Sequence, residues 1–174
     1  MSSVHENTIY SLKENVTGRE DDGCRFRYVL SGEAISFFFD VEDEDIVSPY
    51  RKDNENIFLG DAVEVFLSPD GDLTRYKELE VSPFGVRFYG NIRNESGSFP
   101  ELEKIPPAFS ADVRMREGGW RAEIVLPLAA LEGFDGKTMK LNAFRLDKKA
   151  DGRLLLYALN PTLCESFHRP AFFL

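Results

Sequence analysis

Carboxylate side chains crowd one short run of the sequence, where they could bind a hard metal ion. The run overlaps the end of the apolar segment AISFFFDV and includes Asp40, Asp43 and Asp45. Carboxylate oxygens are the ligands that Ca²⁺ prefers, and the end of a strand would bring several of them together. The run lacks the glycine-punctuated spacing of an EF-hand loop, so a solvated charge run is the competing interpretation. No motif in the sequence requires a cofactor, and Ca²⁺ is the one metal ion for which we find candidate ligands.

Glutamates on expected strands form a second group of candidate functional residues. Glu78 and Glu80 alternate within YKELEVSP and so project to the same face of a strand, ~7 Å apart. Such a pair, or Asp61 with Glu64, could act as the acid and base of a glycosidase. Acidic pairs arise by chance in a chain with 30 Asp and Glu residues, so we expect an exposed polar face here and no active site.

Histidine and cysteine offer little catalytic chemistry. His5 and His168 lie near opposite ends of the chain, and neither has a partner at zinc-ligand spacing. No GxSxG, HExxH or Cys-His signature accompanies His168, which favours a structural or surface role over a catalytic one. Cys24 and Cys164 are too few for a disulfide framework, so two ordinary thiols, or at most one bridge, are expected.

The aromatic residues divide into core and surface candidates. The only tryptophan, Trp120, falls in register with Ala122 and Ile124 in WRAEIVL, which predicts that it lies in the core. A platform that stacks against a sugar must instead lie at a loop or a strand edge. The aromatic residues at such positions are Phe58, Tyr50, Tyr89 and Phe167.

The elements that would position these side chains are mainly strands. Short apolar or alternating runs ended by turn residues predict strands at 34–41, 61–67, 76–83, 86–93, 109–115, 120–126, 140–147 and 153–159. Asp-Gly in the 68–72 turn favours an antiparallel hairpin. Only 127–133 carries helix start and stop signals, which predict one short helix or 3₁₀ turn. The expected fold is therefore all-β, a two-sheet antiparallel β-sandwich of the immunoglobulin-like or jelly-roll type, with a closed barrel as the alternative. Residues 1–174 form a single domain in this interpretation.

Charge and hydropathy exclude several classes of partner. The net charge of −9 is opposite to that of a phosphate-binding surface, so nucleic acid is excluded. No apolar run approaches the ~18–20 residues of a membrane-spanning helix, so no membrane partner is expected. The first residues lack the basic start and apolar stretch of a secretory leader, which predicts a cytoplasmic protein by default and an extracellular one if the natural sequence extends upstream.

Five segments in a fixed order carry a resemblance to a known family. They are GDAVEVFLSP (60–69), YKELEVSPFG (76–85), GGWRAEIVLP (118–127), LNAFRLD (141–147) and FHRPAFF (167–173). Together they resemble the family 9 carbohydrate-binding modules over about residues 30 to 174. The resemblance implies a sandwich that holds a sugar between two aromatic side chains, here Phe58 and Phe167. It also implies that Glu64 accepts hydrogen bonds from sugar hydroxyls. We expect Arg169, which lies nearby in the sequence, to supply a further polar contact.

Three functional hypotheses follow. The leading one is a non-catalytic carbohydrate-binding domain for a mono- or oligosaccharide, linked to carbohydrate catabolism as relatives of the family are. The second is a protein-interaction module whose partner contacts the loop at 94–108, which is rich in Ser, Pro and Glu. The third is a glycoside-processing enzyme, which rests on the abundance of carboxylates and on the attachment of such modules to glycoside hydrolases.

Overall fold

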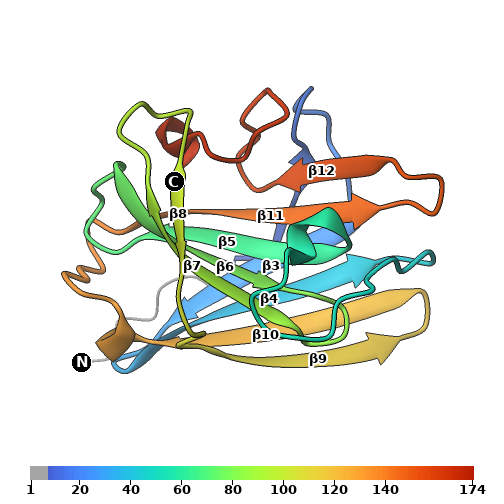
Figure 1. Cartoon of the computed structure of the whole chain (residues 1–174), viewed down its shortest axis with the longest axis horizontal. Coiled ribbons are helices and arrows are strands. Elements are labelled where there is room, and N and C mark those ends of the chain that lie inside the picture. The colour runs from blue at the N-terminus through green and yellow to red at the C-terminus, as the bar shows by residue number, and fades with distance from the viewer. Residues whose placement is uncertain (1–7) are drawn as a thin grey trace.

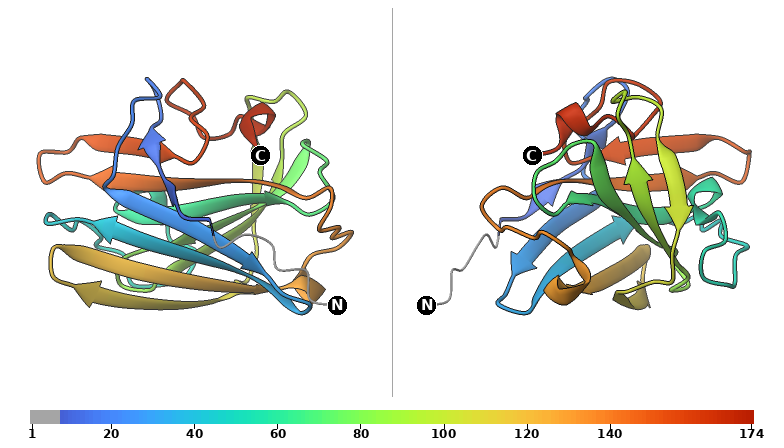
Figure 2. Two further views of the ribbon diagram at one scale, coloured as in Figure 1. Left: turned by 180° about the vertical axis from the view of Figure 1, so that it is seen from behind. Right: turned by 60° about the vertical axis from the view of Figure 1, so that its left-hand side comes forward.

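The computed structural model describes residues 8–174, which form two antiparallel β-sheets packed face to face (Figure 1). The five-stranded sheet has the order β1-β3-β4-β10-β9. Its strands are β1 (Tyr10–Ser11), β3 (Cys24–Leu30), β4 (Ala34–Glu42), β10 (Gly119–Pro127) and β9 (Ser110–Arg116). Seen from behind, β3, β4, β10 and β9 form one continuous layer (Figure 2).

The seven-stranded sheet has the order β2-β12-β11-β5-β6-β7-β8. Its strands are β2 (Lys13–Glu14), β12 (Leu154–Ala158), β11 (Lys140–Lys148), β5 (Ala62–Ser68), β6 (Arg75–Val81), β7 (Arg87–Arg93) and β8 (Glu101–Lys104). The described helical elements are three 3₁₀ turns, η1 (Ile57–Leu59), η2 (Leu128–Ala130) and η3 (Pro170–Phe172). The expected all-β sandwich is confirmed. η2 lies in the one segment for which the sequence predicts a helical turn, whereas η1 and η3 were not predicted.

Alternation along the strands explains the core between the sheets. On β4, Ile35, Phe37 and Phe39 point inward and are buried, because every second side chain of a strand faces the same side. Trp120 of β10 is also buried in this core, as its register predicts, and its indole N–H lies 3.4 Å from an Asp43 oxygen.

Strand β3 is a segment that the sequence reasoning missed. Cys24 and Phe26 are buried on one face while Arg25 lies on the other and is exposed, so the alternation was present in CRFRYVL. The region 94–108 is not a plain loop either, because it contains β8, which pairs with β7. β8 is an edge strand with all four residues exposed.

The central strands of the seven-stranded sheet are buried on both faces. On β5, Val63, Val65 and Leu67 belong to the core between the sheets, whereas Ala62 and Phe66 belong to a second apolar cluster. That second cluster lies on the outer face, meaning the face turned away from the five-stranded sheet. The C-terminal segment contributes Phe167 and Phe173 to it, and Phe58 of η1 packs against it. No helix among residues 8–174 is long and apolar enough to cross a membrane.

Candidate functional site

A row of four side chains crosses the outer face of the seven-stranded sheet. Phe144 of β11 pairs in register with Glu64 of β5, Glu64 with Glu80 of β6, and Glu80 with Phe88 of β7. These four strands are consecutive neighbours in the sheet (Figure 1). The row therefore has an aromatic ring at each end and two carboxyl groups in the middle.

The two aromatic residues that the resemblance assigns to sugar binding lie at the two ends of this row. Phe167 stacks on Phe144 with ring centroids 4.1 Å apart and planes at 20°. Phe58 meets Phe88 edge to face at 6.0 Å. Phe58 is half-buried, whereas Phe167 is only 8 % exposed. The fold thus brings both residues and Glu64 to one face of one sheet.

Glu64, Glu78 and Glu80, the glutamate cluster, are buried at 3 %, 5 % and 0 % exposure. The expectation of an exposed polar face at Glu78 and Glu80 is therefore wrong. Burial raises the pKa of all three carboxyls, and mutual repulsion raises the pKa of Glu64 and Glu80 further. Strand alternation did put Glu78 and Glu80 on one face, but it could not show that distant chain segments cover that face.

His168 is part of this cover. Its ring stacks on Phe66 at 4.7 Å, and its Nδ1 lies 2.9 Å from the Tyr76 hydroxyl oxygen. Its Nε2 lies 3.9 Å from Oε2 of Glu78. Burial lowers the pKa of His168 to about 4, so the ring is neutral at pH 7 and packs as part of the apolar cluster.

Arg169 follows directly after His168 and is half-buried. It makes no ion pair with any of the described residues, and its guanidinium approaches Cys164 Sγ at 4.0 Å. Apart from this contact, in which Nη1 is the donor, its guanidinium N–H groups make no ion pair with a described residue that would compete with a polar ligand.

Two of the aromatic candidates have other positions. Tyr89 is buried in the core between the sheets, where its ring packs edge to face against Phe109. It therefore cannot serve as a surface platform, and that expectation is wrong. Tyr50 is half-buried and packs in a small cluster with Ile57, Val86 and Phe88 beside η1.

The structure separates the three aspartates proposed as calcium ligands. Asp40 is held by Arg116 and Arg121 at 2.7 and 3.0 Å. One oxygen of Asp45 accepts a hydrogen bond from the backbone N–H of Ala150. Only Asp43 joins a group of three ligand-type side chains, and its partners are Asp61 and Asp147.

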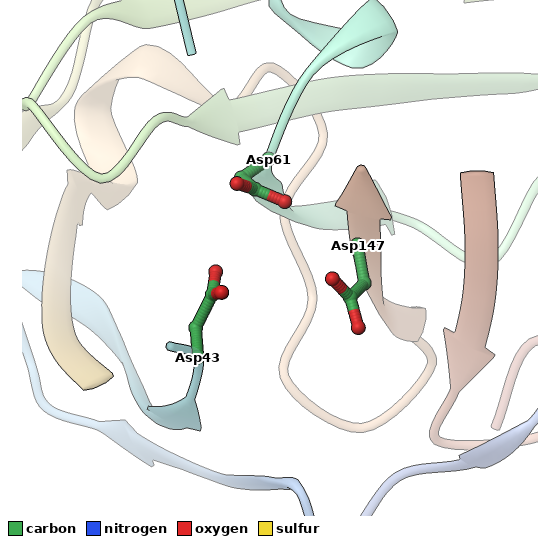
Figure 3. Close-up of side chains that lie close together, drawn as sticks. All are labelled: Asp43, Asp61 and Asp147. Carbon is green, nitrogen blue, oxygen red and sulfur yellow. The ribbon is translucent and has the colours of Figure 1, made fainter. Parts of the chain in front are cut away.

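Asp43, Asp61 and Asp147, the aspartate cluster, meet where both sheets end (Figure 3). They come from the residue after β4, the residue before β5 and the end of β11. Burial raises the pKa of Asp61 to about 7, although the backbone N–H groups of Val47 and Lys148 donate hydrogen bonds to it.

The aspartate cluster has basic side chains of its own. The buried Arg145 lies 3.4 Å from Asp147 and 3.9 Å from Asp43, and Lys149 lies 2.9 Å from Asp147. Arg145 and Asp147 lie on β11, and Lys149 directly follows it. The sequence signal for this cluster was weak, because its members are far apart in the chain and only the sheet register brings them together.

Two hollows lie elsewhere on the surface. One of about 450 Å³ is on the five-stranded sheet, where Arg25, Arg27 and Phe38 line it. The other, of about 730 Å³, lies beside β6 and β7, where Lys77 and Asn91 line it. Neither hollow includes a residue of the row that runs from Phe144 to Phe88.

Comparisons with known proteins identify the fold. No protein-family model matches the sequence, and no curated protein matches it. Among solved structures, one similar chain is a protein from Bacteroides uniformis ATCC 8492 that has been proposed to bind carbohydrate. It is 19 % identical with a TM-score of 0.74, and the match covers 94 % of this chain and 83 % of that one.

Two further structures are family 9 carbohydrate-binding modules from Caldicellulosiruptor kristjanssonii. One, in complex with cellotriose, is 13 % identical with a TM-score of 0.67 over 94 % of this chain and 78 % of that one. The other, in complex with glucose, is 14 % identical with a TM-score of 0.66, and the match covers 94 % of this chain and 81 % of that one. The chain therefore has the β-sandwich fold of the family 9 carbohydrate-binding modules.

Proposed function

We propose that this protein is a non-catalytic carbohydrate-binding domain. The observation that carries the proposal is the row across the outer face, with Phe167 stacked at one end, Phe58 at the other and Glu64 between them. A pyranose presents an apolar C–H face that an aromatic ring can cover, and its hydroxyls need acceptors and donors. Glu64 supplies an acceptor and Arg169 supplies donors.

The structural neighbours support a saccharide as the ligand. Two of them hold cellotriose and glucose, and both share the topology that places Phe58, Glu64 and Phe167 on one face here. As the family resemblance implies, we place the domain in carbohydrate catabolism, where it would attach an enzyme or assembly to its sugar.

The spacing of the glutamate cluster does not suit hydrolysis. An acid and a nucleophile that cleave a glycosidic bond lie on either side of it, with their carboxyl groups about 5–5.5 Å apart in retaining enzymes. One oxygen from each member of the cluster lies within 4.8 Å of the others, which leaves no room for a glycosidic bond between two of them, whereas a single acceptor on one side of a sugar needs no such space.

Titration calorimetry with glucose and cellotriose tests the proposal. The apolar area that two phenylalanine rings can cover is modest, and at ~25 cal/mol per Å² of buried apolar surface we expect a Kd on the order of 1 mM. The variant Phe58→Ala should weaken binding at least tenfold. Phe99→Ala is the matched control, because Phe99 is 83 % exposed in the 94–108 region and should leave sugar binding unchanged.

Circular dichroism and thermal melting show whether each variant folds. Should Phe58→Ala fail to fold, Phe58→Leu keeps most of the apolar volume and removes the flat ring. Sugar affinity equal to wild type in a folded Phe58 variant would contradict the proposed platform. A wild-type protein that binds neither saccharide would contradict the proposed function.

A specific observation favours a protein partner as the second candidate. Phe99 is exposed, Leu102 is half-exposed, and both lie in 94–108, next to or on the edge strand β8. An edge strand can pair with a strand of another chain. If the protein binds no sugar, Phe99 and β8 are the surface at which binding of a protein partner should be tested. The variant Phe99→Asp should disrupt that binding.

A further inference from the structure

The glutamate cluster lies under the proposed sugar-binding face, but its own geometry calls for a different ligand. Glu64 and Glu80 are directly opposite each other on β5 and β6, and Glu78 is two residues before Glu80 on the same strand face. One carboxylate oxygen from each residue lies within 4.8 Å of the others. Three acidic groups are thus held together by the backbone register of two adjacent strands.

Several oxygens of this cluster have no donor group from outside the cluster in the described part of the chain. Both carboxylate oxygens of Glu80, which is 0 % exposed, and Oε2 of Glu78 receive no hydrogen bond from a described N–H or hydroxyl group, and the described groups within hydrogen-bonding reach of them are the other carboxyls of the cluster. A buried carboxylate without a donor is costly, so such groups are normally paired or coordinate a metal ion. The fold therefore leaves acceptor oxygens aimed into the cluster that a ligand of positive charge would satisfy.

The aspartate cluster provides the contrast. There Arg145 and Lys149 supply positive charge, and backbone N–H groups donate to Asp61. Among the described residues, no Lys or Arg side chain forms an ion pair with the glutamate cluster. The one basic ring that faces it, His168, stays 3.9 Å from Glu78, which is too far for a direct hydrogen bond.

We propose that Glu64, Glu78 and Glu80 bind a calcium-sized divalent cation. Ca²⁺ binds oxygen ligands at 2.3–2.6 Å, so two ligands on opposite sides of one ion lie up to about 5 Å apart, which agrees with the spacing of these oxygens. The cluster offers carboxylate oxygens alone, whereas zinc sites usually include histidine or cysteine. This site uses none of the three aspartates that the sequence suggested as calcium ligands. It shares Glu64 with the proposed sugar contact, but the ion needs no sugar in order to bind.

The test uses the metal alone, with no sugar present. The whole chain is dialysed against EDTA, transferred to metal-free buffer and titrated with CaCl₂ by calorimetry, and its melting temperature is measured with and without Ca²⁺. Wild type should bind one ion through this site and melt at a higher temperature in Ca²⁺, because a ligand that binds only the folded state stabilises it. Binding of MgCl₂ should be at least tenfold weaker.

Two variants distinguish the two acidic clusters. Glu80→Gln should lose at least tenfold in calcium affinity, and Asp61→Asn is the matched control that should keep wild-type affinity. In EDTA, Glu80→Gln should melt at or above the wild-type temperature, because it removes a repulsive buried charge; in Ca²⁺ the order should reverse. This reversal separates a metal ligand from a merely structural glutamate.

Several results would overturn the proposal. They are the absence of calcium binding to wild type, an equal affinity for Mg²⁺, and loss of binding in Asp61→Asn while Glu80→Gln keeps it. If Glu80→Gln does not fold, Glu78→Gln takes its place with the same expected loss. A protein that binds Ca²⁺ but no saccharide would support this site while contradicting the proposed function.

Discussion

At the scale of single residues, Glu64 places a carboxyl group where burial disfavours its charge. It lies between Phe144 and Glu80 in the row across the sheet and is almost completely buried. The resemblance assigns it to sugar hydroxyls, and the structure adds two more carboxyls beside it. The role of Glu64 therefore depends on which cation or hydrogen-bond donor binds to the glutamate cluster.

The two cysteines allow a prediction about reactivity. Both are free thiols, Cys24 buried and Cys164 half-buried. Burial raises the pKa of Cys24 to about 12, and the thiolate is the reactive form. Iodoacetamide at pH 8 should therefore modify Cys164 alone in the folded protein and both residues in urea, as measured by intact mass.

The control for this labelling is Cys164→Ser, which should remain unmodified until it unfolds. Modification of Cys24 in the folded protein would show that β3 opens readily, because Cys24 begins that strand.

At the scale of elements, β5 connects the core to the candidate site. One face of β5 packs against the five-stranded sheet, and its other face carries Glu64 and Phe66. Because side chains alternate along a strand, a shift of one residue in register would exchange these faces. The apolar core therefore holds Glu64 on the outer face.

The pairing of β4 with β10 gives a prediction about stability. Gly119 opens β10 opposite Glu42, and a Cβ there would lie 1.9 Å from the backbone carbonyl oxygen of Val41. Because that contact is with backbone, the strands must separate. Gly119→Ala should lower the free energy of unfolding by about 2–4 kcal/mol in urea denaturation.

Gly32 offers the matched control for this substitution. It lies between β3 and β4, and an added Cβ would meet nothing within 4 Å. Gly32→Ala should change stability by less than about 0.5 kcal/mol. Equal effects of the two substitutions would contradict the close approach of β10 to β4.

At the scale of the whole molecule, the two sheets share one continuous apolar core. Residues from β3, β4 and β10 pack with residues from β5, β6 and β11 in a single cluster. Neither sheet can bury its inner face without the other, so the described part of the chain should behave as one cooperative unit.

Trp120 makes this cooperativity measurable. Its buried indole should give blue-shifted fluorescence in the folded protein. Urea unfolding followed by this fluorescence and by far-UV circular dichroism should give coincident transitions, as a two-state domain requires. Refolding should take milliseconds to seconds, because strands distant in the chain must pair. Transitions at different urea concentrations would show that the sheets unfold separately.

Most of the long strands and much of the core could be predicted from the sequence, whereas β3 and β8 were missed. Alternation of apolar residues is a local pattern, so it revealed β4, β5 and β10, and it predicted the burial of Trp120. The ordered motifs also indicated the sandwich. Even the missed strand β3 carries this alternation in Cys24, Phe26 and Tyr28.

Which polar groups meet, and which of them are buried, could be seen only in the folded chain. Glu64 meets Glu80 because β5 pairs with β6 in one particular register, and Asp43 meets Asp61 and Asp147 because both sheets end at one place. The outer face is covered because Phe167 and His168, about a hundred residues further along the chain than Glu64, pack onto it. Local patterns carry no information about such long-range contacts, so the burial of the three glutamates could only come from the folded chain.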